Sequence, residues 1–196
     1  SGTGERCWNL AYMAQGAFFR PISSDDGQSG PRPHIGLIDE LHEHKTNTVV
    51  EMMRAGTKSR RQALIFMITN AGHNRMGPCW SYHEYGAKVA AGEVEDDAFF
   101  PFVCGLDESD DPFADESCWP KANPSLQDAD LPGMKYIREQ VVEAKGMPSK
   151  EAIVRRLNFC QWTDAESPWI SGEVWRGAQR DFDWQDLRGR RAVAGL

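Results

Sequence analysis

The hydrophobic pattern of the first half of the chain is dominated by two short, continuous apolar runs. The first, Ile35–Ile38, follows prolines and ends in charged residues, whereas the second, Ala63–Ile68, ends in small polar residues and a glycine. Continuous apolar runs of this length are typical of the buried strands of a parallel sheet. Between them, residues 46–55 carry apolar side chains at helical spacing, and Gly56 follows as a stop signal. We therefore predict a buried βαβ unit over residues 34–68, with the usual right-handed connection.

Outside this unit the pattern predicts shorter strands and several helices. Two short strands are expected around Gly16, and a third apolar run contains Pro101, which restricts it to the edge of a sheet. The expected elements are, in chain order, strands over 7–12 and 17–22, a helix over 78–91, the edge strand over 99–104, helices over 134–145 and 149–159 with Ser149 as the cap of the second, and the start of a strand over 190–196. An acidic loop at 106–112 and a proline-rich turn at 119–124 precede the last helices.

The first apolar run ends in two adjacent carboxylates, Asp39 and Glu40. Ligands of open α/β sheets bind at the carboxyl ends of the strands, and paired acids there are costly unless they meet a cation or a reacting group. In P-loop ATPases this is the Walker B arrangement, in which the first acid holds Mg²⁺ through water and the second polarises the attacking water. A strand that simply ends in solvated acids is the alternative.

The second apolar run ends in Thr69-Asn70-Ala71-Gly72. Parallel pairing of the two runs would place Thr69 and Asn70 beside the two acids, where such side chains can sense a γ-phosphate or the attacking water; a plain strand-end turn is the alternative. The segment 56–59, Gly-Thr-Lys-Ser, resembles the tail of a phosphate-binding loop, but it follows a helix and lacks the required glycine spacing. We therefore reject that segment as a phosphate site.

Composition and charge narrow the possible function classes. No apolar run approaches the roughly 18 residues that a membrane span needs, so we expect no membrane contact. The five cysteines are scattered and never in C-x-x-C spacing, which favours free thiols in a reducing compartment. The net charge of −7 argues against a dedicated nucleic-acid-binding domain. Basic residues gather from Arg176 onward, so any contact with a phosphate backbone is expected there; charge alone favours the alternative, in which the acidic and basic segments are simply solvated faces.

Five segments in order resemble the large terminase subunit of tailed double-stranded-DNA bacteriophages, in particular its HK97-like branch. They are Ile35–His42, Arg61–Gly72, Leu106–Asp111, Trp119–Leu126 and Arg156–Trp162. The resemblance implies an α/β fold: the C-terminal half of a P-loop ATPase sheet of the additional-strand type, parallel and flanked by helices, followed by a small helical linker. It also implies three regions, namely the second half of the ATPase domain at 1–105, a helical lid or linker at 106–165, and a linker with the first strand of an RNase H-like nuclease at 166–196.

By this resemblance, Asp39 holds Mg²⁺ through water, Glu40 is the catalytic carboxylate, and 69–72 is the coupling motif that links hydrolysis to movement on DNA. The family often has threonine where this chain has Asn70. No phosphate-binding loop and no nuclease metal ligand occur in the 196 residues, so we expect an internal fragment that is inactive alone. The arginines near the expected site leave the identity of an arginine finger open; they are Arg20, Arg32, Arg60 and Arg61.

The resemblance further implies cofactors and partners for the parent protein. It would hydrolyse ATP with Mg²⁺ to move double-stranded DNA into a procapsid, and it would cut concatemeric DNA with a second Mg²⁺ or Mn²⁺ site in its nuclease domain. Its implied partners are DNA, the small terminase subunit and the portal protein, on which it forms a homo-oligomeric ring. The implied location is the cytoplasm of the infected bacterium, with transient docking on the procapsid and absence from the mature virion.

Two other functions compete with this interpretation. A zinc hydrolase could be built on His42-Glu43-His44 with Asp39 or Glu40, but histidines two apart face opposite sides of a strand and do not converge on a helix, and the H-E-x-x-H spacing is absent. The second is a degenerate ATPase-like module that only binds partners, which the missing phosphate-binding loop fits. A phosphate-binding loop encoded upstream would favour the motor.

Overall fold

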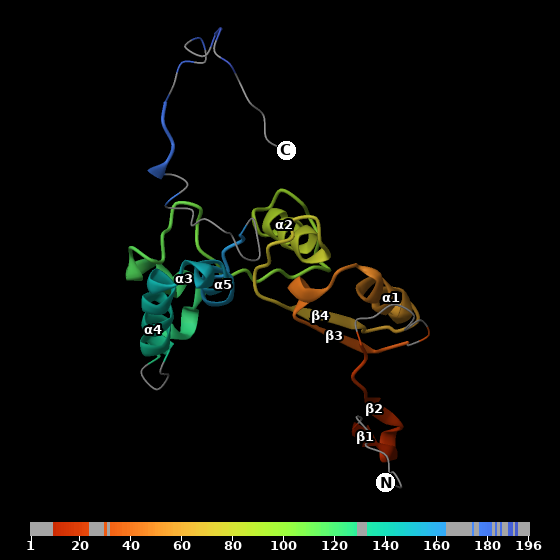
Figure 1. Ribbon diagram of the computed structural model, residues 1–196. Coiled ribbons are helices and arrows are strands. Elements are labelled where there is room, and N and C mark those ends of the chain that lie inside the picture. Colours follow the sequence, from red (N-terminus) through yellow and green to blue (C-terminus); the bar gives the residue numbers. More distant parts are fainter. Residues whose placement is uncertain are drawn as a thin grey trace.

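The computed structural model describes residues 10–23, 30, 32–128 and 133–163, together with 174, 177–181, 183, 185, 188–189 and 191. Figure 1 shows a small N-terminal hairpin, a two-stranded sheet with helices α1 and α2, and a cluster formed by helices α3, α4 and α5. Within the described residues, no helix is both long and apolar enough to cross a membrane. The strand expected at 190–196 lies outside the described residues, apart from Arg191.

The predicted βαβ unit is confirmed as strand β3 (Ile35–Asp39), helix α1 (Thr48–Thr57) and strand β4 (Leu64–Ile68). The two strands pair in parallel, from Ile35 opposite Leu64 to Asp39 opposite Ile68. Helix α1 runs one residue past the predicted stop. Gly36 lets α1 approach, because a Cβ there would lie 2.9 Å from Ile65 Cδ1 and 3.7 Å from Met53 Cβ.

The expectation of strands buried on both faces is wrong. On one face Ile38 packs with Leu41, Val50 and Cys79, all of them buried, under α1 and α2. The other face carries side chains that are at least half exposed; they are Ile35, Leu37, Leu64, Phe66 and Ile68. A continuous apolar run indicates burial on both faces only where helices cover both, and α1 and α2 lie on the same side of the sheet (Figure 1).

The two short strands expected around Gly16 are confirmed as an antiparallel hairpin. Strand β1 (Leu10–Tyr12) pairs with β2 (Ala17–Phe19), and a 3-10 turn, η1 (Met13–Gln15), joins them. Gly16 ends the turn in the left-handed region at φ 61°, which glycine adopts without steric cost. All residues of both strands are exposed, so the hairpin adds nothing to the core.

Helix α2 (Pro78–Ala90) matches its prediction, and the remaining helices form a second core. They are η3 (Glu116–Cys118), α3 (Trp119–Ala122), η4 (Pro124–Gln127), α4 (Gly133–Gly146) and α5 (Pro148–Phe159). The turn expected at 119–124 is therefore largely helical. Helix α5 begins one residue before the expected cap, because Pro148 occupies its first turn and Met147 precedes it. Trp119 and Phe159, which are 1% and 0% exposed, form the centre of this core.

The edge strand expected at 99–104 is wrong, since this segment is irregular in the structure. Phe100 and Phe102 are 89% and 76% exposed. Only the start of the segment packs on α2, where Phe99 stacks against Tyr82 and Pro101 fills the space above Gly86. Apolar residues alone do not form a strand without a neighbouring edge to pair with, and Pro101 has no N–H to donate to one.

Candidate functional site

The two acids lie where the sequence predicts them, at the carboxyl end of β3. Asp39 is the last residue of the strand, and its Oδ1 accepts a hydrogen bond of 3.0 Å from the Glu40 backbone N–H. Glu40 adopts a left-handed conformation, φ 50° and ψ 51°, which is uncommon for a residue with a side chain. This sharp turn directs the chain into η2 (Leu41–Glu43), which the buried Leu41 anchors in the core.

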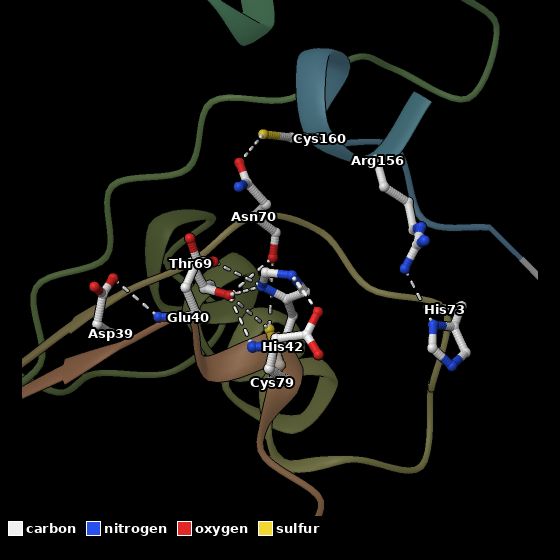
Figure 2. Close-up of polar contacts among 10 residues, drawn as sticks. Asp39, Glu40, His42, Thr69, Asn70, His73, Cys79, Arg156 and Cys160 are labelled. Atoms are coloured by element: carbon white, nitrogen blue, oxygen red, sulfur yellow. Dashed lines mark hydrogen bonds and ion pairs between the residues drawn. The ribbon is translucent and has the colours of Figure 1, made fainter. Parts of the chain in front are cut away.

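The tip of β4 reaches the same place, as the parallel pairing predicts. The Thr69 hydroxyl accepts a hydrogen bond of 2.9 Å from the His42 backbone N–H, and it lies 3.1 Å from His42 Nδ1. The same hydroxyl lies 2.9 Å from the Asn70 carbonyl oxygen and 3.6 Å from the Cys79 thiol. Thr69 therefore joins the turn after β3 to the end of β4 (Figure 2).

His42 also contacts two carboxylates. Its Nδ1 lies 3.1 Å from Glu40 Oε2, and its Nε2 lies 3.1 Å from Glu43 Oε1. The imidazole side chain is only 5% exposed, whereas those of Glu40 and Glu43 are 52% and 71% exposed. In the described part of the chain, no three or more His, Cys, Asp or Glu side chains are arranged to hold a metal ion. The sequence singled out His42 only as a possible zinc ligand, so its contact with Glu40 was missed.

The loop that continues from Thr69 is held at its far end by α5 and the residues after it. The Cys160 thiol lies 3.9 Å from Asn70 Oδ1, and the Thr163 N–H donates to the Gly72 carbonyl at 3.3 Å. Ala71, in the middle of the loop, is 5% exposed. Gly72 has no room for a side chain, because a Cβ there would lie 3.2 Å from a ring atom of Trp162.

A further far-end contact joins Arg156 to His73. The Arg156 side chain comes from the last turn of α5, and its Nη1 lies 3.2 Å from His73 Nδ1 (Figure 2). Arg156 is 8% exposed, and among the described residues its Nε has no hydrogen-bond partner. Sequence reasoning missed this pair because no local pattern connects residues so far apart in the chain.

The thiols beside the loop are poor nucleophiles. Burial raises the pKa of Cys79 and of Cys160 above the ordinary value, and a hydrogen bond with the Thr69 hydroxyl offsets only part of the effect at Cys79. Both residues therefore stay protonated near neutral pH and act as packing and weak hydrogen-bonding groups.

Three of the four candidate arginines, Arg32, Arg60 and Arg61, precede their strands and so lie at the wrong end of the sheet for an arginine finger. Arg60 Nη2 donates to the Arg32 carbonyl at 3.1 Å, and both residues precede their strands, at the amino ends. A cavity of about 440 Å³ lies between the starts of α1 and α2, where Lys45 and Arg54 line it together with Tyr82. Neither carboxylate of the site lines that cavity, so the cavity is separate from the acid pair.

Comparison with known proteins places the chain in a family. Residues 11–88 match the family model for the ATPase domain of the terminase large subunit, and residues 93–196 match the model for its endonuclease domain. Protein YmfN of Escherichia coli (strain K12) is 30% identical over 154 residues, which is 76% of this chain and 32% of that protein.

The fold has a counterpart among solved structures. The crystal structure of the HK97 bacteriophage large terminase superimposes with a TM-score of 0.62 at 20% identity, over 82% of this chain and 33% of that one. This match confirms the predicted α/β fold, with a parallel sheet and flanking helices. The chain spans about a third of the length of both relatives. The chain belongs to the terminase large-subunit family, as the resemblance of its motifs predicted.

Proposed function

We propose that the protein containing this chain hydrolyses ATP to drive double-stranded DNA into a bacteriophage procapsid, with Glu40 as the catalytic carboxylate. One observation carries the proposal: in a chain of the terminase large-subunit family, the turn that follows the two acids at the end of β3 is hydrogen-bonded through His42 to the Thr69 hydroxyl at the end of β4. The carboxyl edge of a parallel sheet is where α/β proteins bind and act on ligands.

In this proposal Asp39 is the Mg²⁺ carboxylate. Its side chain is exposed at the strand end, and one oxygen is already used by the Glu40 N–H. Mg²⁺ in nucleotide sites takes one or two carboxylates and fills its other positions with water and phosphate oxygens. A single exposed carboxylate fits that role, and it does not fit a metal held by protein side chains alone. When bound, Mg²⁺ with ATP supplies the phosphoryl group and neutralises its charge.

Glu40 would orient the attacking water and accept its proton. The left-handed backbone at this position turns its side chain away from the path of the strand, and the side chain is half exposed and so open to water. Residues held in rare backbone conformations occur often at active sites, where the surrounding structure compensates the strain. The buried Leu41 and the Thr69 hydrogen bond to His42 supply that support.

Residues 69–72 would act as the coupling motif. Thr69 contacts the turn that carries the catalytic acid, while Asn70 and Gly72 contact the end of α5 and the residues after it. A rearrangement at the acids would therefore reach the helical cluster through one short loop. The division of the chain at residues 105/106 and 165/166 stays a prediction.

Family membership supports the remaining assignments. The match of residues 93–196 to the endonuclease model supports cleavage of concatemeric DNA by the whole protein, with Mg²⁺ or Mn²⁺ bound in its nuclease domain. We further propose DNA, the small terminase subunit and the portal protein as partners. The protein would form a ring that docks on the procapsid in the host cytoplasm.

The test is a matched pair of substitutions in the whole protein. Glu40→Gln keeps the size and hydrogen-bonding oxygen of the side chain but removes its basicity, so we expect turnover of ATP to fall about 10²- to 10⁴-fold with nucleotide affinity unchanged. Glu43→Gln is the control, because Glu43 is three residues away and also contacts His42. Undiminished turnover in Glu40→Gln would remove the catalytic role from Glu40. Absence of ATP hydrolysis by the unmodified protein would favour a partner-binding module instead.

A further inference from the structure

We propose that His42 is a positioning residue that aims the Glu40 carboxylate through its Nδ1–H and links that carboxylate to the tip of β4. The inference rests on the proposed function of Glu40 and extends it to a residue with no other assigned role. Three contacts meet at this imidazole: Glu40 Oε2, Glu43 Oε1 and the Thr69 hydroxyl, each at 3.1 Å.

The contrast in burial supports a positioning role. A half-exposed glutamate samples several rotamers, and fixing such a side chain costs up to about 2 kcal/mol of conformational entropy. The His42 side chain is only 5% exposed, and contacts of its backbone N–H and of its Cβ fix its position. Its N–H is bonded to Thr69, and its Cβ lies 3.5 Å from the position that a Cβ on Gly72 would take. A fixed donor beside a mobile acid selects one orientation of that acid.

We expect these contacts to contribute little to the folding stability of the protein. Ion pairs and hydrogen bonds to exposed carboxylates contribute little to folding, because water competes for both partners. Catalysis is more sensitive, since a displacement of about 1 Å in a reacting group can reduce the rate about 100-fold. We therefore expect loss of the His42 donor to change turnover strongly and the melting temperature little.

The ring nitrogens have different partners, and this distinguishes the two carboxylates. A neutral imidazole carries hydrogen on one nitrogen and an imidazolium on both, so a hydrogen bond toward Glu40 needs hydrogen on Nδ1, and one toward Glu43 needs hydrogen on Nε2. The proposed function requires the Nδ1 donor. Because Thr69 lies beside the same Nδ1, movement of the β4 tip would alter the aim of Glu40.

Two amide substitutions separate the nitrogens. The amide nitrogen of asparagine occupies about the place of Nδ1, and that of glutamine about the place of Nε2. In the whole protein we expect His42→Gln to lower kcat about 10- to 100-fold, whereas His42→Asn retains about half of the turnover or more. For both variants, we expect the nucleotide dissociation constant to change less than about twofold and the melting temperature to match that of the unmodified protein.

Equal turnover in the two variants overturns the proposal, and so does a loss of turnover that is accompanied by a lower melting temperature.

A second experiment does not depend on turnover: nitrogen-15 NMR of labelled histidine reports the protonation and hydrogen bonding of each ring nitrogen. Glu40→Gln is expected to shift the Nδ1 signal of His42 more than Glu43→Gln does. An unchanged Nδ1 signal in Glu40→Gln also overturns the proposal. Failure of the proposed function shows itself separately, as full turnover in Glu40→Gln while the NMR response persists.

Discussion

Replacing Trp119 with phenylalanine tests whether one buried side chain holds the helical cluster that contacts the 69–73 loop. Trp119 is 1% exposed, and its indole N–H donates to the Pro112 carbonyl at 2.8 Å. Its ring centroid lies 5.7 Å from that of Phe159, which is fully buried at the end of α5. Phenylalanine keeps an aromatic ring in this place but removes the donor and part of the apolar volume.

The expected cost follows from these two losses. Pro112 is itself fully buried, so its carbonyl would be left without its indole partner, at a cost of about 1–3 kcal/mol. The apolar atoms removed contribute about 2 kcal/mol, at about 0.8 kcal/mol for each methylene equivalent. Together these losses reduce the free energy of unfolding by roughly 3–5 kcal/mol, which is a large share of the 5–15 kcal/mol or so that typical domains have.

Urea unfolding of the 196-residue chain, followed by far-ultraviolet circular dichroism, measures this loss. Trp80→Phe is the matched control, because Trp80 is only half-buried on α2 and packs edge-on against Trp162 at 4.7 Å. We expect the control to cost about 1 kcal/mol or less, as is usual for partly exposed positions. A cost for Trp119→Phe no larger than that of the control would refute the view that the Trp119 hydrogen bond organises the cluster.

Two further predictions concern the loop and the acidic surface. Gly72→Ala would place a Cβ 3.2 Å from Trp162, so we expect the free energy of unfolding to fall by about 1–3 kcal/mol and the tryptophan fluorescence to change. Gly146→Ala is the control, because no atom lies within 4 Å of its new Cβ, and it should lose no stability. Hydrogen bonding to Lys121 holds the pKa of Asp110 below its ordinary value of 3.8. The stability that this pair contributes is therefore fully present above pH 3.8, and it is lost as the pH falls through the lowered pKa. Melting temperatures measured across the acid range should show a smaller loss for Asp110→Asn, and an unchanged profile in that variant would contradict the assignment.

The strands and helices that the sequence predicted correctly are those with a strong local signal. The apolar runs at 35–38 and 63–68 predicted both strands and their parallel pairing, because a helical segment of suitable length joins them. The run at 99–104 has a similar composition but forms no strand. The composition of a segment indicates only that it is able to form a strand. Strand formation also needs the free edge of another strand nearby, and no local sequence pattern encodes where that edge lies.

The same limit applies to the site. Asp39, Glu40 and Thr69 were predictable because each follows an apolar run directly, so the sheet brings them together. The role of His42 depends on a turn that a left-handed glutamate starts, and the Arg156 contact depends on how α5 packs. Glu40 and His42 are only two residues apart, but their contact needs that turn, and the Arg156 contact is tertiary, so neither has a period or a motif that sequence reasoning could have found.

The 69–73 loop joins the turn that carries Glu40 to helix α5. Thr69 is bonded to the turn that carries Glu40, and four residues later His73 is bonded to Arg156 of α5. Between these two contacts the buried Ala71 and the hydrogen bond from Thr163 to Gly72 hold the loop in place. A shift of α5 relative to β4 would therefore act on Thr69 through this short segment. Because Thr69 also touches the His42 ring, such a movement would reach the orientation of Glu40 without any contact between α5 and the acid itself.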